Sequence, residues 1–194
     1  MRILFWSSAF WPSIGGIQVL AARLLPALEK RGCEHLVVST KSGCVEHEVA
    51  DLDGIPVHYF PFWESMVDAK QLAKTRQQVA ELKREFRADL IHINGLSRSD
   101  FYHHLTAHES PAPLLVSLHS AWLPEENQLA MRTMSSAEWV VACSDSTLTG
   151  ARDMVPDITC RSSVLHNGLD LPSLTPTELS FDPLRILCLG RLVE

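Results

Sequence analysis

The chain has 194 residues, the length of one ordinary domain with room for a sizeable core. Hydrophobic residues make up 46% and charged residues 21%, a balance typical of a soluble globular protein that excludes disordered, collagen-like and membrane-spanning chains. The formal net charge of −6 means that the chain lacks the electropositive surface that general nucleic-acid binding needs, so nucleic acid is not an expected partner.

The cysteines and the N-terminus both indicate a cytoplasmic protein. The 5 cysteines are odd in number and widely spaced, and no two form a C-x-x-C pair, so we expect reduced, mostly buried thiols. The first apolar stretch is interrupted by Ser7 and Ser8 and reaches Pro12 too early for the apolar region of a signal peptide. The sequence also contains no N-x-[ST] sequon.

Short β-rich runs alternate with longer helical stretches along the chain. This alternation predicts the α/β class, with a Rossmann-like parallel sheet and helices on both faces. The runs are almost continuously apolar, as expected of strands that are buried on both sides. The predicted strands are residues 2–7, 35–40, 57–60, 89–94, 114–119, 138–143 and 163–166.

Amphipathic stretches between these runs predict the helices. The first carries Ile17, Leu20, Leu24 and Leu28 at helical spacing, and Gly32 follows as a C-terminal cap. Residues 68–86 predict a longer helix, and shorter helices are predicted at 98–107, 125–135 and 146–154. Acidic residues are interleaved with the basic residues of the long helix, which favours a solvated face over a membrane or nucleic-acid surface. These basic residues are Lys70, Lys74, Arg76, Lys83, Arg84 and Arg87.

The composition and periodicity of the sequence change after Asp170. Residues 171–184 contain three prolines and no periodicity, which predicts a linker on the surface. Residues 185–190 (RILCLG) then repeat the pattern of the opening RILFWS, either as a last strand of the same sheet or as the first strand of a second, similar domain. We favour the second interpretation, which predicts a domain at 1–170, an interdomain linker at 171–184 and the start of a C-terminal domain at 185–194.

Two adjacent glycines, Gly15 and Gly16, lie in the loop between the first strand and the first helix. They either turn the chain or let the backbone approach an anion at the helix N-terminus, where free N–H groups carry partial positive charge. The loop matches neither the dinucleotide fingerprint G-x-G-x-x-G nor the P-loop.

His119 ends the predicted strand 114–119, at the sheet edge where open α/β sheets bind ligands. Position therefore makes it a candidate for a ligand-binding or catalytic role, with a structural histidine as the alternative. Ser144 lies in ACSDS rather than G-x-S-x-G, which argues against a hydrolase triad. His104 and His108 are spaced to share a helix face, but no third ligand has suitable spacing, so we expect them to face solvent and expect no metal site.

Four aromatic residues flank Pro61, just after a predicted strand: Tyr59, Phe60, Phe62 and Trp63. They either line an apolar groove for an acceptor or pack beneath the long helix, and core packing is the favoured interpretation. Association with a membrane surface through the long helix or the Trp63 region stays open.

The ordered series of motifs resembles the N-terminal domain of retaining GT-B glycosyltransferases of glycosyltransferase family 4. The stretch FWPSIGGIQVLAARLLPALEKRGCEHLVVST resembles the opening of these enzymes, and DLIHIN resembles their fourth strand. LLVSLHSAW, VVACSDSTLTGARD and VLHNGLD follow in the family's order, and LCLGRLVE resembles the start of the C-terminal domain. The resemblance covers nearly the whole chain.

This resemblance implies transfer of a sugar, of hexosyltransferase type, from a nucleotide-sugar donor to a glycan or lipid-linked acceptor. Gly15 and Gly16 would approach the donor phosphates or the transferred sugar, and His119 would hydrogen-bond the donor sugar near the reacting centre. Arg191 would help to neutralise the leaving diphosphate, the role that a metal ion plays elsewhere, so no cofactor or metal is expected.

Three further residues would belong to the interdomain cleft. Asn167 and Gly168 would shape its hinge side, and Ser144 is expected to cap the helix that follows it, with a binding role open. The sequence departs from the family at Cys33, where histidine is common, a change we interpret as structural. The lysine partner of Arg191 and the acidic E-x7-E motif do not occur in these residues, so we expect the chain alone to be inactive.

Two other functions are compatible with the same residues. One is a nucleotide or sugar-phosphate binding module without catalysis, against which the strand-like run 185–190 argues. The other is a sugar-nucleotide epimerase of the same architecture, which would need no acceptor. We expect a cytoplasmic protein, which could also lie peripherally at the inner face of the membrane. This location is compatible with both of these functions.

Overall fold

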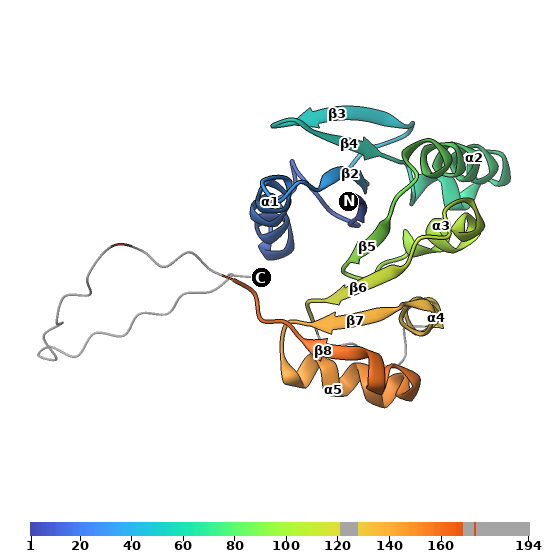
Figure 1. The fold of residues 1–194 in the computed structure, drawn as a ribbon. Helices are drawn as coiled ribbons and strands as arrows, with labels where there is room; N and C mark the ends of the chain where they lie inside the picture. Colours follow the sequence, from blue (N-terminus) through green and yellow to red (C-terminus); the bar gives the residue numbers. More distant parts are fainter. Residues whose placement is uncertain (121–127, 169–172, 174–194) are drawn as a thin grey trace, which may run out of the picture.

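The computed structural model describes residues 1–120, 128–168 and 173. Its centre is an eight-stranded sheet in the order β3-β4-β2-β1-β5-β6-β7-β8, parallel throughout except for the antiparallel pair β3 and β4 (Figure 1). The α/β, Rossmann-like class is thereby confirmed. The strands are β1 (Arg2–Trp6), β2 (Glu34–Ser39), β3 (Glu48–Leu52), β4 (Ile55–Tyr59), β5 (Leu90–Asn94), β6 (Leu114–Leu118), β7 (Trp139–Ala142) and β8 (Ser162–Val164).

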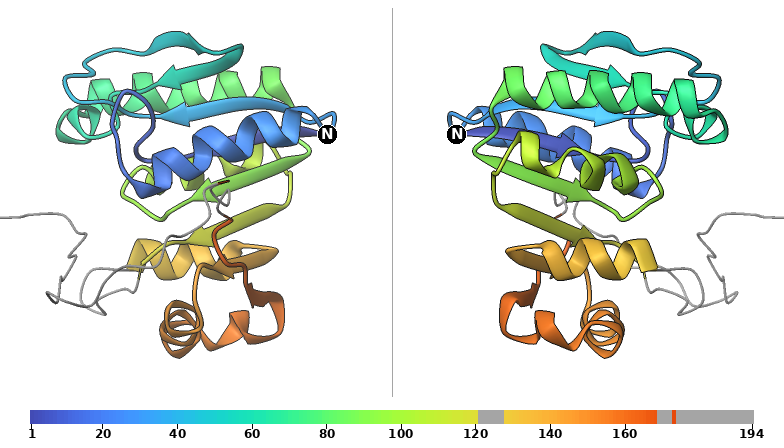
Figure 2. Two further views of the ribbon diagram at one scale, coloured as in Figure 1. Left: turned by 90° about the vertical axis from the view of Figure 1, so that its left-hand side faces the viewer. Right: turned by 90° about the vertical axis from the view of Figure 1, so that its right-hand side faces the viewer.

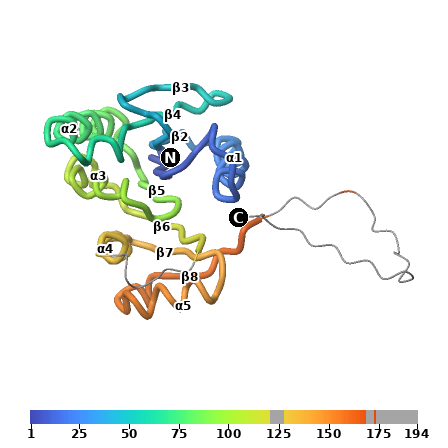
Figure 3. The backbone as a smooth tube through the Cα atoms, turned by 180° about the vertical axis from the view of Figure 1, so that it is seen from behind, coloured from blue at the N-terminus to red at the C-terminus, as the bar shows by residue number. Residues whose placement is uncertain are grey.

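The helices cover both faces of this sheet, as predicted. α1 lies on one face, and α2, α3 and α4 lie on the other (Figures 1 and 3). Figure 2 shows these two faces in turn. The α-helices are α1 (Gly16–Glu29), α2 (Ala69–Phe86), α3 (Asp100–Leu105), α4 (Gln128–Ser136) and α5 (Asp145–Met154). Short stretches of 3-10 helix occupy Glu64–Val67, Ala107–Glu109 and Pro156–Arg161. The first part of the helix predicted at 125–135 lies outside the described residues.

Strand β3 is absent from the prediction because it is a short, exposed edge strand. Four of its five residues are exposed, and Asp51 interrupts its apolar residues. It forms a hairpin with β4 through Asp53 and Gly54, which both have positive φ, at 51° and 90°. Asp-Gly is a strong signal for a two-residue hairpin turn, so this pair of residues was the available clue.

Side chains of the central strands alternate between two buried clusters. Leu4 and Trp6 of β1 belong to the larger one, with Val79 of α2 and Leu148 of α5. Phe5 points to the other face and packs in the smaller cluster with residues of α1. On the α1 side, residues of β5, β6 and β7 are less covered: Leu90, Leu115 and Val141 are only half-buried.

The aromatic residues around Pro61 are mainly core, as favoured. Tyr59, Phe60 and Phe62 are buried, and only Trp63 reaches solvent, with 38% of its surface exposed. The ring of Phe62 lies between those of Trp6 and Tyr102, with centroid distances of 5.3 and 5.0 Å. Phe60 and Phe62 therefore pack beneath α2, whereas Tyr59 packs in the smaller cluster on the α1 side.

Lys83 contradicts the prediction that all basic residues of the long helix are solvated. It is fully buried, and its Nζ donates to the carbonyl oxygens of His103 and Thr106 at 3.2 and 3.4 Å. Burial lowers its pKa to about 7. The prediction from charge is wrong for Lys83 because this residue lies on the inward stripe of α2, one residue after Leu82. The other basic residues of the prediction are exposed.

The prediction that His104 faces solvent is also wrong. His104 is half-buried, its Nε2 lies 2.9 Å from Oγ1 of Thr133, and burial lowers its pKa to about 4. His108 is exposed as expected and pairs with Glu109, but α3 ends at Leu105, so the two histidines share no helix face. Within the described ranges, no cluster of three or more His, Cys, Asp or Glu side chains is arranged to hold a metal ion.

Burial of the cysteines is lower than expected. Of the four free cysteines in the described part, only Cys44 is buried, Cys33 and Cys143 are half-buried, and Cys160 is exposed. Over the same residues, the helices lack the combination of length and hydrophobicity that a membrane span requires.

Candidate functional site

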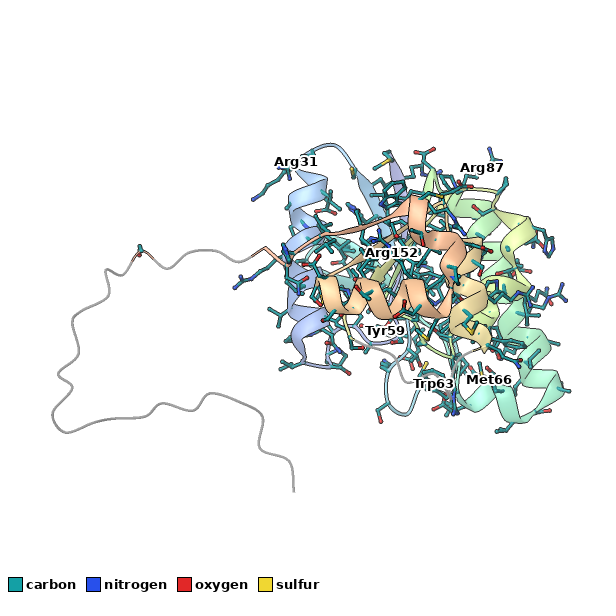
Figure 4. All side chains as sticks on the ribbon, turned by 90° about the horizontal axis from the view of Figure 1, so that it is seen from below. Arg31, Tyr59, Trp63, Met66, Arg87 and Arg152 are labelled. Atoms are coloured by element: carbon teal, nitrogen blue, oxygen red, sulfur yellow. The ribbon has the colours of Figure 1, made fainter. Side chains whose placement is uncertain are left out.

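The carboxyl ends of the parallel strands meet at one edge of the sheet. Asn94 ends β5, His119 directly follows β6, and Ser144 follows β7 at this edge. Figure 4 separates the two edges, with Trp63 and Met66 at the carboxyl edge and Arg31 and Arg87 at the opposite end. Open α/β sheets bind ligands at the carboxyl edge, so a ligand site is expected here.

A cavity of about 480 Å³ extends along the half-buried α1 face of β5, β6 and β7 as far as this edge. Its lining at this edge includes the polar residues Asn94, His119 and Asn167, together with Gly168. Its apolar lining comes from α1 and from the half-buried strand residues. Three residues predicted as site residues, His119, Asn167 and Gly168, therefore line one cavity.

His119 is held by its neighbour on β5. Its Nε2 lies 2.8 Å from Oδ1 of Asn94, and burial lowers its pKa below the usual value for histidine, which favours the neutral ring. Its other nitrogen, Nδ1, is buried and has no hydrogen-bond partner within the described ranges. A buried polar atom without a partner is destabilising unless a ligand satisfies it.

Gly95 lets the start of α1 approach His119. It has a φ of +85°, and a Cβ at this position would lie 3.7 Å from Cδ1 of Ile17 and 3.9 Å from Cδ2 of His119. Ile17 immediately follows Gly15 and Gly16, so the predicted glycine loop and His119 are close together. A side chain at residue 95 would strain the backbone at this point.

The N-terminus of α1 has no hydrogen-bonded side-chain cap among the described residues, although a Cβ on Gly15 would lie 2.6 Å from Oε1 of Gln18. Gly15 is its N-cap, and its first turn contains no acidic residue. Gly16 is exposed, with free space around it. Free N–H groups and the helix dipole favour an anion at such a terminus. Gly15 and Gly16 thus occupy the position that the anion-site interpretation requires.

Ser144 has the capping role that the sequence predicts. Its Oγ accepts a hydrogen bond from the backbone N–H of Thr147 at 3.3 Å, at the start of α5. The exposed residues Asn167 and Gly168 follow His166, whose Nδ1 lies 3.2 Å from the carbonyl oxygen of Cys143. Arg191 lies outside the described residues, as do 185–190 and nearly all of the predicted linker.

Sequence reasoning missed Asn94 and the polar row that it begins. Asn94 contacts His119, and on the same face Nε2 of His92 lies 2.7 Å from Oγ of Ser117. The available signal was the run DLIHIN itself, in which polar residues alternate with apolar ones toward the end of a strand.

Comparison with known proteins identifies the family to which the chain belongs. The fold and the cavity define a Rossmann-like domain with a candidate ligand site at the carboxyl edge of its sheet. Residues 14–172 match the model of Glycosyltransferase Family 4, so the chain belongs to that family. The comparison with curated proteins gives no match.

Solved structures share the fold at low sequence identity. The apo lipopolysaccharide outer core galactosyltransferase WaaB has a TM-score of 0.64 and 16% identity, over 90% of this chain and 48% of its own. Sucrose-phosphate synthase from Thermosynechococcus elongatus has a TM-score of 0.60 and 13% identity, over 86% and 48%. MurG of Acinetobacter baumannii has a TM-score of 0.56 and 10% identity, over 87% and 46%. This chain therefore spans about half the length of these structures.

Proposed function

We propose that this chain is the acceptor-side half of a retaining GT-B glycosyltransferase of hexosyltransferase type. Residues 1–170 form the N-terminal domain, 171–184 the interdomain linker and 185–194 the first strand of a donor-binding domain. Membership of Glycosyltransferase Family 4 supports this proposal, as do the transferase and synthase names of its structural neighbours. The observation that carries it is the placement of His119 beside the uncapped N-terminus of α1 at the carboxyl edge.

In this proposal the two features act on opposite parts of a nucleotide-sugar donor. The N–H groups at Gly16 approach the donor phosphates or the transferred sugar, because the helix terminus favours negative charge. His119 hydrogen-bonds the sugar and orients it near the reacting centre, where positive oxocarbenium-like charge develops. Asn167 and Gly168 shape the hinge side of the cleft, and any contact of Ser144 is secondary to its capping role.

Arg191 takes the part that a metal ion plays in other transferases. We propose that it neutralises the leaving diphosphate together with groups of the C-terminal domain, so that transfer needs no metal or cofactor. The acceptor is a saccharide or a lipid-linked saccharide. We place the enzyme in the cytoplasm, with peripheral contact at the inner face of the membrane for a lipid-linked acceptor. The 194-residue chain alone is inactive, since donor-binding groups are missing from it.

Incubation of the native gene product with nucleotide-sugar donors and glycan acceptors tests the proposal, with NMR of the product's anomeric proton as the readout. We expect a glycosidic product only when acceptor is present, with the anomeric configuration of the donor retained, and no product from the 194-residue chain. Conversion of the nucleotide sugar without any acceptor would contradict transfer and identify an epimerase. Donor binding without turnover by the native product would identify a binding module.

A further inference from the structure

The contact between Asn94 and His119 bears on which ring nitrogen of His119 carries the hydrogen, as well as on the position of the ring. Asn94 is 5% exposed, and its segment is fixed from two sides. Gly95 donates its N–H to the carbonyl oxygen of Ser117 at 2.9 Å, and Oγ of Ser7 lies 3.4 Å from the carbonyl oxygen of Asn94. These contacts hold the backbone at the end of β5, and the side chain of Asn94 places its Oδ1 2.8 Å from Nε2 of His119.

A carbonyl oxygen accepts hydrogen bonds and cannot donate them. The imidazole nitrogen that faces Oδ1 of Asn94 at 2.8 Å must then carry the hydrogen, and that nitrogen is Nε2. Neutral imidazole has one N–H, so Nδ1 is left with a lone pair. This nitrogen is the buried atom of His119 that has no partner in the described part of the chain.

We propose that Asn94 is a positioning residue that fixes His119 as the Nε2–H tautomer, so that Nδ1 accepts a hydrogen bond from a sugar hydroxyl of the substrate. The identity of this ligand group rests on the proposed function. A phosphate oxygen is excluded at Nδ1, because two acceptors cannot form a hydrogen bond. The site thus divides the donor between the N-terminus of α1, which suits the anionic part, and His119, which suits a hydroxyl.

Several other titratable groups line the same cavity as His119. Burial, together with the nearby charges of His119 and His35, lowers the pKa of His92 to about 4. The other such groups in the lining are the amino group of Met1, Arg23 on α1, Cys143 after β7 and His166 after β8.

Two-dimensional NMR of the 194-residue chain labelled with ¹⁵N-histidine tests the tautomer, because the two ring nitrogens give separate long-range correlations. We expect His119 of the unaltered chain to be the Nε2–H form at pH 7. Asn94→Ala should mix the two tautomers. Asn94→Asp should keep Nε2–H and raise the pKa of His119, since a carboxylate stabilises the imidazolium.

Ser117→Ala is the matched control, because it removes the partner of His92 from the same cavity and leaves the Asn94 contact in place. It should leave the tautomer of His119 unchanged. An Nδ1–H tautomer in the unaltered chain, or an Asn94→Ala variant that keeps pure Nε2–H, would overturn the proposal. The unaltered chain decides the first point even if a variant does not fold.

A second experiment, on the native gene product, tests which ligand group His119 contacts. It compares the effect of a variant on kcat with its effect on the inhibition constant of the nucleoside diphosphate. Asn94→Ala should lower kcat about tenfold, and should leave the inhibition constant of the free nucleoside diphosphate unchanged. A matching loss of diphosphate affinity would show that His119 faces phosphate, which overturns the hydroxyl assignment. Absence of transfer by the unaltered product would contradict the proposed function, whereas the tautomer measured by NMR would still stand.

Discussion

His119→Ala in the native gene product is expected to lower kcat/KM for sugar transfer about a hundredfold. The substitution removes the one side chain that, in the proposed function, lies against the donor sugar near the reacting centre. A hydrogen bond that orients the sugar and strengthens as charge develops acts mainly in the transition state. The loss should therefore appear in kcat more than in KM, as measured by initial rates of acceptor glycosylation.

His108→Ala is the matched control for this variant. His108 is an exposed histidine that pairs with Glu109 and does not line the cavity, and exposed ion pairs contribute little to stability. Its removal should leave transfer within about twofold of the unaltered enzyme. If His119→Ala transferred sugar as fast as this control, His119 would be a structural residue and its proposed role at the donor sugar would be wrong.

Phe62→Ala is expected to lower the free energy of unfolding of the 194-residue chain by about 3–5 kcal/mol. Phe62 is fully buried, and its ring packs against those of Trp6, Phe60 and Tyr102. Alanine would leave a cavity between these rings in addition to the lost burial of apolar surface. Urea unfolding followed by circular dichroism measures the change.

Trp63→Ala is the neighbouring control, because Trp63 is 38% exposed and its ring makes no aromatic contact with the described core. It should cost about 1 kcal/mol or less. If both variants lost the same small amount of stability, the aromatic residues after β4 would not be core residues. The alternative interpretation, an apolar groove for the acceptor, would then regain support.

The sheet was predictable because the central strands are continuous apolar runs. Every described strand except β3 matches a predicted run within a few residues, since buried strand positions favour apolar residues. β3 escaped because an exposed edge strand carries no such pattern. Lys83 was predicted to be solvated because of its charge, although helical spacing places it on the buried face with Val79 and Phe86. The contact of His104 with Thr133 joins two helices, so the spacing within one helix could not show it.

The site was only partly predictable. His119 could be found because the end of a parallel strand fixes its place at the ligand edge, whatever its side chain does. Its partner Asn94 lies 25 residues away in sequence, on the neighbouring strand, and only the strand order and register bring the two together. The proximity of Ile17 to His119 depends in the same way on the backbone of Gly95.

The intact mass of the native gene product in its own cells decides between a two-domain transferase and a single domain. A two-domain transferase requires a mass on the order of 40 kDa, because a second domain of similar size is needed to bind the donor and complete the cleft. We expect this result. A native mass of 21.7 kDa, that of this chain alone, would leave no such domain. That result would contradict a two-domain transferase and favour a binding module.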